Sequence, residues 1–306
     1  STMSYKAEAQ IVREIGKFLL NGSLYKGSRP VMWSVVEKTA LADAEVEYKD
    51  KSDNAIYVLF PINKTNLKIE DKKNINILIW TTTPWTIPGN RALAFGRDLK
   101  YSLIEVENVK QNSLVKLGDK LIFAEDLLNT VSEEIGITSF KKIKNFKGHN
   151  LSDCLCEHPF KRIGYDFDVR AFHGDFVNLE QGTGIVHIAP GHGDDDYKLG
   201  IKNGIDIIQT VQDDGRYNHH AKGFEGEHIY KVDDKIAEKL KELLKLLFKG
   251  TLRHSYPHSW RSKAPLIYRN TPQWFISMEK NKLREIALKS IDETIFYPPQ
   301  GQTRLR

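Results

Sequence analysis

The sequence has few of the features that mark secreted or membrane proteins. Only two of its 306 residues are cysteines, Cys154 and Cys156, and one residue separates them. They are too close for an ordinary disulfide, so we expect a reducing, cytoplasmic setting and thiols that serve packing. No run reaches the ~20 apolar residues of a membrane helix. The longest apolar patch of the C-terminal half, 243–248, is interrupted by Lys245, and no secretory signal is visible, so we expect no membrane partner.

The chain also lacks a large excess of charge of either sign. The chain has 45 Lys and Arg against 40 Asp and Glu, a net charge of +5, which permits nucleic-acid binding without arguing strongly for it. Basic residues are scattered and are not interleaved with aromatics in any known RNA-binding motif. With 40% hydrophobic residues, the chain can bury a core and form one large domain or two ordinary ones.

Periodicity divides the chain into segments. Residues 4–20 carry apolar side chains at helical spacing and predict an amphipathic helix, and the polar run 49–54 predicts a turn or a boundary. A helix fits at 124–134. Short apolar runs predict strands at 56–60, 75–80, 101–106, 121–123 and 184–188. Uneven strand spacing, few helices and many turn residues predict an α+β fold, with a barrel-like β core and peripheral helices.

The C-terminal part changes character. Leucines at helical spacing predict a helix over 232–249 that packs through one face, and a second helix is expected over 279–290, before Pro298-Pro299. We therefore divide the chain into residues 1–50, a β-rich core at 51–230 and a helical segment at 231–306. The flanking parts are expected to form β-ribbon and helical connectors.

A threonine-rich segment is the first candidate for chemistry. Residues 80–90 read Trp-Thr-Thr-Thr-Pro-Trp-Thr-Ile-Pro-Gly-Asn, with four hydroxyls, one amide and two prolines. The prolines favour a fixed, non-helical path, and the hydroxyls could bind a ribose or an ester where a strand enters a loop. Threonine is also a common strand residue, so an ordinary strand edge explains the three adjacent threonines at least as well.

A second segment, 182–197, joins an apolar strand to a Gly/Pro loop with two histidines and three aspartates. Glycines allow a ligand to approach the backbone, and a carboxylate could hold an ammonium group. A turn with a solvated acidic tip is the simpler alternative. His187, His192 and Asp196 do not follow a familiar zinc spacing, and the loop lacks the Gly-Lys-Ser/Thr of a phosphate-binding loop. No Gly-x-Ser-x-Gly elbow is present, which argues against a serine hydrolase.

Together the two segments resemble the editing domain that is inserted into class I aminoacyl-tRNA synthetases. Residues 81–90 resemble its threonine-rich peptide and 182–197 its partner loop. Trp85 after the proline, where the valine and leucine enzymes typically carry an acidic residue, resembles the isoleucine enzymes. Residues 30–48, 256–261 and 272–278 also resemble the family's sequences, so the resemblance extends over nearly the whole chain. The His-x-Gly-His and Lys-Met-Ser-Lys-Ser signatures are absent, so we expect an excised piece that does not activate amino acids.

The resemblance implies hydrolysis of wrongly made valyl-tRNA(Ile). A binding site cannot strongly reject a substrate that is smaller by one methylene, and the isoleucine enzymes are themselves a known example of this limit. The implied partners are the valine-bearing 3′ end of tRNA(Ile) and the rest of the synthetase, to which the flanking parts would connect. A monomer without a cofactor is expected. Two alternatives remain: a free-standing deacylase that edits in trans, and a non-catalytic tRNA-binding module.

The resemblance also implies roles for single residues. Asp196 is expected to bind the α-ammonium group, and His187 to block isoleucine in the wall of the side-chain pocket. Thr86 is expected to shape the same pocket. The residues expected to contact the adenosine, the ester or the attacking water are Thr81, Thr82, Thr83 and Asn90. Further substrate contacts are expected from Trp80, Ala189 and His192.

One departure from the family pattern concerns metal. Many relatives carry paired Cys-x-x-Cys motifs in the two flanking segments, where this sequence has Ser34 and Glu37, and Ser259 and Ser262. Serine and glutamate replace thiolates poorly in a structural zinc site. We therefore predict that no zinc is bound there.

Overall fold

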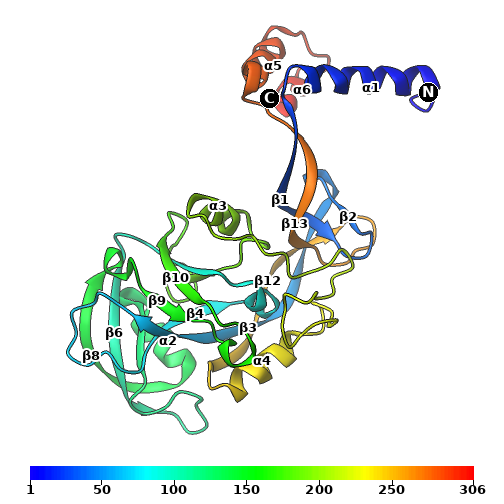
Figure 1. The fold of residues 1–306 in the computed structure, drawn as a ribbon. Coiled ribbons are helices and arrows are strands. Elements are labelled where there is room, and N and C mark those ends of the chain that lie inside the picture. Colours follow the sequence, from blue (N-terminus) through cyan, green and yellow to red (C-terminus); the bar gives the residue numbers. More distant parts are fainter. The chain divides into compact units, whose positions relative to one another are not determined.

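A large mixed sheet organises the computed structural model, which describes residues 1–306 (Figure 1). Its strands are β3 (Val46–Lys64), β4 (Ile75–Thr81), β5 (Ala92–Phe95), β6 (Lys100–Val109), β7 (Lys120–Ala124), β8 (Ile137–Lys147), β9 (Leu155–Glu157), β10 (Asp168–His173), β11 (Ile185–Ile188) and β12 (Leu246–Ser259). Their order is β11-β5-β10-β9-β3-β4-β7-β6-β8, with β12 paired to β3. β5 pairs in parallel with β10, and β4 with β7. No pairing joins β8 to β11 to close the sheet, so the barrel-like character predicted from the sequence is not confirmed.

The chain also forms helices and short 3-10 turns. The helices are α1 (Tyr5–Leu20), α2 (Leu128–Ile135), α3 (Asp194–Lys202), α4 (Asp233–Glu242), α5 (Leu283–Glu293) and α6 (Gln300–Leu305). The 3-10 turns are η1 (Asp43–Glu45), η2 (Pro84–Gly89), η3 (Glu125–Leu127), η4 (Gly148–Leu151), η5 (Lys161–Ile163) and η6 (Lys280–Lys282). A smaller sheet has the order β13 (Ile267–Ile276), β1 (Leu24–Ser34) and β2 (Thr39–Ala40). None of the helices is long and apolar enough to cross a bilayer.

The central strands are buried on both faces, which explains their nearly continuous apolar sequences. In β3, Ile56, Val58 and Phe60 belong to one hydrophobic cluster, whereas Tyr57 and Leu59 belong to a second cluster on the other face. Helix α2 contributes to the second cluster, and α4 to the first. The predicted strands at 56–60, 75–80, 101–106, 121–123 and 184–188 are all confirmed. Both cysteines are buried free thiols in the first cluster, as expected for packing residues.

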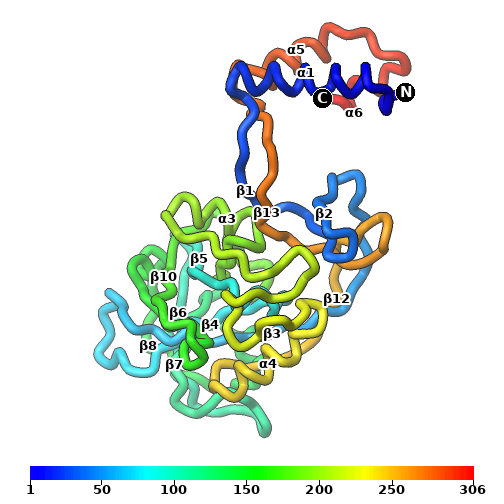
Figure 2. The backbone as a smooth tube through the Cα atoms, turned by 45° about the vertical axis from the view of Figure 1, so that its right-hand side comes forward, coloured from blue at the N-terminus to red at the C-terminus, as the bar shows by residue number.

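The predicted helix at 232–249 is wrong in its second half. Helix α4 ends at Glu242, Leu244 adopts a left-handed backbone conformation, and the chain enters β12 at Leu246. The adjacent residues Leu246 and Leu247 point to the two different hydrophobic clusters, which is the period of a strand and not of a helix. Helix α4 itself lies against β3 and β12 (Figure 2). Leucine spacing alone could not separate these two elements.

The polar run 49–54 forms no turn, because it lies inside the long strand β3 and pairs with residues 251–256 of β12. Cross-strand charge pairs make a polar strand acceptable here. The Asp50 carboxylate pairs with Arg253 on β12 at 3.0 Å, and the Asp53 carboxylate lies 2.8 Å from His254 Nε2 on the same strand.

The chain divides into two compact units, Pro30–Asn270 and a second unit formed by Ser1–Arg29 with Thr271–Arg306. The second unit contains α1, α5 and α6. Helix α1 confirms the amphipathic helix predicted at 4–20, and α5 lies close to the helix predicted at 279–290. The candidate site lies entirely within Pro30–Asn270.

Candidate functional site

A cavity of about 290 Å³ lies where the two candidate segments meet. Strand β4 leads into the threonine segment, and β11 leads into the loop that bears the histidine and aspartates. Strand β11 lies against β4 and pairs with β5. Nine of the ten residues expected at the site line this cavity: Trp80, Thr81, Thr82, Thr83, Thr86, His187, Ala189, His192 and Asp196. Tertiary structure therefore brings together segments that are about a hundred residues apart in sequence.

The threonine segment is held by its own hydroxyl groups. Strand β4 ends at Thr81, and Pro84 starts the 3-10 turn η2. The Thr83 backbone N–H donates to Thr81 Oγ1 at 3.1 Å, and the Thr86 N–H donates to the Thr83 carbonyl at 2.9 Å. The Thr82 hydroxyl makes no hydrogen bond within the protein, although it lines the cavity. It is therefore free to bind a ligand.

His187 is fixed in the cavity wall through Thr86. The Thr86 hydroxyl donates its only proton to the Thr83 carbonyl at 2.9 Å, so it accepts the hydrogen bond from His187 Nε2 at 3.0 Å. This arrangement places the imidazole proton on Nε2 and leaves Nδ1 buried without a partner. Burial lowers the pKa of His187 to about 4, so the ring is neutral near pH 7.

Asp196 faces this wall from the first turn of α3. Its carboxylate accepts a hydrogen bond from the Ala189 N–H at 2.7 Å, and the side chain remains partly exposed. Burial raises the pKa of Asp196 to about 7, against the smaller, opposite effect of the Ala189 hydrogen bond. Gly193 allows this packing, since a Cβ there would lie 3.0 Å from the Asp196 carboxyl carbon. A cation bound in the cavity would favour the ionised form of Asp196.

His192 is fixed in the cavity wall by hydrogen bonds to the rest of the protein. Its Nδ1 lies 3.1 Å from the Tyr268 carbonyl and its Nε2 2.9 Å from Thr210 Oγ1, so both ring nitrogens are occupied. Its ring meets the Trp85 ring edge-on at 5.1 Å. These contacts suit a residue that shapes the cavity through its carbons.

Asn90 is the one expected residue that does not line the cavity. It is fully buried, and its Nδ2 donates to the Ala92 carbonyl at 2.8 Å. Its Oδ1 is buried without a partner. In this structure Asn90 therefore shapes the chain between η2 and β5.

Other residues that were not predicted from the sequence also line the cavity, among them Gln181, Thr183 and Gly193. The Thr183 hydroxyl donates to the Ile185 carbonyl at 3.1 Å and so helps to turn the chain into β11. These three positions lie inside or beside the 182–197 segment, but nothing in their residue types distinguishes cavity walls from turn residues.

The four residues that stand in place of the family's paired cysteines form a hydrogen-bonded cluster. The four side chains Ser34, Glu37, Ser259 and Ser262 come together, and a carboxylate lies at their centre. Glu37 accepts hydrogen bonds from Ser34 Oγ, from Ser259 Oγ at 2.9 Å and from the Ser262 N–H at 3.0 Å. No group of three or more His, Cys, Asp or Glu side chains in the structure is arranged to hold a metal ion.

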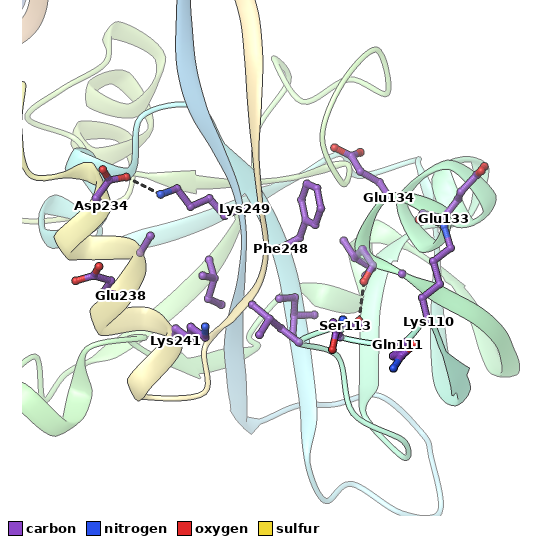
Figure 3. A pocket seen from close by; sticks show the side chains of 17 residues that line it. Lys110, Gln111, Ser113, Glu133, Glu134, Asp234, Glu238, Lys241, Phe248 and Lys249 are labelled. Carbon is purple, nitrogen blue, oxygen red and sulfur yellow. Dashed lines mark hydrogen bonds and ion pairs between the residues drawn. The ribbon is translucent and has the colours of Figure 1, made fainter.

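A second, larger cavity of about 540 Å³ lies between α2, α4 and β12 (Figure 3). Its floor is apolar, and its rim carries lysines and carboxylates. Lys249 pairs with Asp234 at 2.5 Å, and Lys110 Nζ donates to the Glu133 carbonyl at 3.3 Å. None of the ten expected site residues lines it. The smaller cavity is therefore the better candidate for chemistry.

Comparison with known proteins identifies the family. The sequence profile of the tRNA synthetases class I (I, L, M and V) matches residues 1–306. The chain belongs to this family. The isoleucine–tRNA ligase of Pelagibacter ubique (strain HTCC1062) is 54% identical over 306 residues, covering 100% of this chain and 33% of that protein. The corresponding ligase of Gluconobacter oxydans (strain 621H) is 48% identical, covering 99% and 33%.

The chain thus spans 33% of the length of these relatives. Among solved structures, the cytosolic leucyl-tRNA synthetase editing domain of P. knowlesi is similar, with a TM-score of 0.50 and 11% sequence identity. The match covers 65% of this chain and 97% of that one. At this identity, the likeness shows a shared fold.

Proposed function

We propose that the smaller cavity is an editing site that hydrolyses the ester bond of valyl-tRNA(Ile). The observation that carries the proposal is the meeting of an ionisable carboxylate, Asp196, with a rigid wall of Thr86 and His187 in one cavity of about 290 Å³. An aminoacyl ester offers complementary groups, namely an ammonium group, a small side chain and a reactive carbonyl. Membership of the family and likeness to an editing domain support the same activity.

Asp196 supplies the anchor for the substrate. Its ionised carboxylate forms a charge-assisted hydrogen bond with the α-ammonium group, which is about twice as strong as a neutral one. Because the pKa of the unliganded residue is about 7, part of the population is protonated at neutral pH. Binding of the ammonium group then draws the carboxyl towards its ionised form.

His187 and Thr86 supply the size limit. The hydrogen bond of 3.0 Å between them fixes the imidazole, and both side chains are buried, so the wall cannot easily retreat. Inserting one extra methylene against a fixed wall costs about 1–3 kcal/mol, which exceeds the ~0.8 kcal/mol gained by burying it. The isoleucyl ester is thereby disfavoured relative to the valyl ester.

Hydrolysis follows from orientation. The oxygen of a water molecule attacks the ester carbonyl carbon, the bond from that carbon to the ribose oxygen breaks, and a proton passes to the departing ribose oxygen. The free hydroxyl of Thr82, which lines the cavity, would orient the ester or the water. An unassisted threonine hydroxyl is a weak nucleophile near neutral pH, so the threonines act by orientation and form no covalent intermediate.

The same proposal covers partners and organisation. The chain would act on the 3′ end of tRNA(Ile), as a monomer in the cytoplasm, with residues 51–230 as the editing core. Residues 1–50 and 231–306 would join this core to the rest of the synthetase. The helices of the second unit have no buried residues, which is consistent with a further surface for them to pack against.

The deciding experiment compares the hydrolysis of valyl-tRNA(Ile) and isoleucyl-tRNA(Ile) by the purified chain. We expect selective release of valine. Submicromolar, salt-dependent tRNA binding without any release would favour a non-catalytic binding module. Equal hydrolysis of both esters would refute the size limit.

A further inference from the structure

The backbone of Trp85 is held from both sides at the centre of the threonine segment. Its N–H donates to Asp233 Oδ1 at 3.1 Å, and its carbonyl accepts a hydrogen bond from the Tyr217 hydroxyl. Its ring meets the His192 ring at 5.1 Å. Trp85 is buried and lies directly before Thr86, so these contacts fix the part of η2 that carries the Thr86 hydroxyl.

Asp233 is not part of the cavity that we assign to the substrate. It occupies the first position of α4, a helix that packs against η2. It lines a different cavity of about 540 Å³, which also includes Lys51, Asp53 and Trp85. The hydrogen bond from the Trp85 N–H is the direct link between Asp233 and the turn that carries Thr86.

We propose that Asp233 is a positioning residue for the proposed hydrolysis, because its carboxylate fixes Trp85 and thereby the hydroxyls of Thr83 and Thr86. This inference rests on the proposed function of the cavity. The path is continuous: the Thr86 N–H donates to the Thr83 carbonyl at 2.9 Å, and Thr86 Oγ1 lies 3.0 Å from His187 Nε2. A shift of Trp85 therefore moves the threonine turn and the His187 wall together.

The hydrogen bond from the Trp85 N–H needs an acceptor oxygen at position 233, and it does not need a full negative charge there. Burial raises the pKa of Asp233 to about 7, while Lys51 acts in the opposite direction and Asp53 reinforces the rise. Both protonation states of Asp233 are therefore present near pH 7. Each retains an oxygen that accepts from the Trp85 N–H, and so does an asparagine amide.

The test uses two variants at this position and one matched control. Asp233→Ala removes the acceptor, whereas Asp233→Asn keeps it. Asp234→Ala alters the adjacent carboxylate in the same helical turn, which pairs with Lys249 Nζ at 2.5 Å and Asn54 Nδ2 at 3.2 Å and does not bond to η2. The readouts are amide hydrogen exchange in residues 83–90, kcat and KM for valyl-tRNA(Ile), and Tm.

For Asp233→Ala we expect at least tenfold faster exchange in residues 83–90 and a 10–100-fold lower kcat, the typical cost of a misplaced group. Asp233→Asn should remain within about threefold of the wild type in kcat, and Asp234→Ala should leave exchange at 83–90 unchanged. Unchanged exchange in Asp233→Ala would overturn the inference. Equal kcat losses in the alanine and asparagine variants would overturn it too.

Failure of the proposed function has a different signature. If the wild-type chain releases no valine, the editing assignment fails, and the exchange data alone then decide whether Asp233 holds the threonine segment. If the wild type is active and only Asp233→Ala loses kcat at a near-normal Tm, both proposals stand. An equal drop in Tm for both position-233 variants, with kcat following Tm, would reduce Asp233 to a purely structural role and reject the inference.

Discussion

Replacing Asp196 by asparagine should make the protein more stable and less active at once. The pKa of the native carboxyl is raised from 3.8 to about 7, so the folded state holds its proton more tightly than the unfolded chain. The stability that comes from this tighter binding is fully present below about pH 4 and is lost as the pH rises towards 7. Above pH 7 the wild type therefore carries the full cost of an ionised, poorly solvated carboxylate.

The magnitude follows from the size of the shift. About three pKa units correspond to about 4 kcal/mol as an upper limit. Because the side chain is partly exposed, solvent screening reduces this to roughly 1–2 kcal/mol. Asparagine avoids the charge and keeps an oxygen that can accept from the Ala189 N–H. We expect Asp196→Asn to raise Tm by a few degrees at pH 8.

Activity should change in the opposite direction. Loss of one charge-assisted hydrogen bond to the substrate ammonium costs about 1.5–3 kcal/mol, which lowers kcat/KM about 10–150-fold. Thermal unfolding at pH 8 and pH 4, together with deacylation of valyl-tRNA(Ile) at pH 8, tests both effects. At pH 4 the stability difference should largely disappear. A variant that is no more stable at pH 8, or that retains wild-type kcat/KM, would refute the reasoning.

Three further predictions concern the wall and the flanking segments. His187→Ala should hydrolyse correctly charged isoleucyl-tRNA(Ile); if isoleucine stays protected, the size limit lies elsewhere. Thr86→Val should remove the partner of His187 Nε2 and lower the preference for valyl over isoleucyl ester in kcat/KM by about 5–30-fold, an energy of roughly 1–2 kcal/mol, while Thr86→Ser retains the preference; an unchanged ratio in the valine variant would contradict the proposed link. Elemental analysis of the purified protein should find no stoichiometric zinc, and one zinc per chain would overturn the account of the Glu37 cluster. Glu37→Ala should lower the free energy of unfolding in urea by about 1–3 kcal/mol, because it leaves the serine donors unpaired.

The sequence predicts the fold best where apolar residues alternate or repeat over one element. The strands around 56–60 and 75–80 could be found because both of their faces are buried and their sequences are almost entirely apolar. Spacing of apolar residues fails at the leucines of 240–247, because the first of them belongs to helix α4 and the last to strand β12. The polar strand at 49–54 could not be found either, because cross-strand pairing, and not burial, holds it.

The candidate site could likewise be predicted only in part from the sequence. The two segments could be joined because together they resemble a known family, and not because either one is distinctive alone. Asp233 carries no signal of its own, since it begins an ordinary amphipathic helix and reaches η2 only in the folded structure. Asn90 looks like a ligand-binding amide in the sequence, yet burial directs its Nδ2 to the backbone. Side-chain direction at the end of a short turn depends on tertiary packing.

The most direct test of the central claim is to locate a non-hydrolysable valyl-adenosine analogue on the protein by amide chemical-shift mapping at pH 8. We predict that the shifts cluster at Thr82, Thr86, His187 and Asp196, and that the matched isoleucyl analogue produces much smaller changes at the same concentration. Shifts confined to the larger cavity around Lys110 and Lys249, or equal responses to both analogues, would contradict the assignment of the smaller cavity as the editing site.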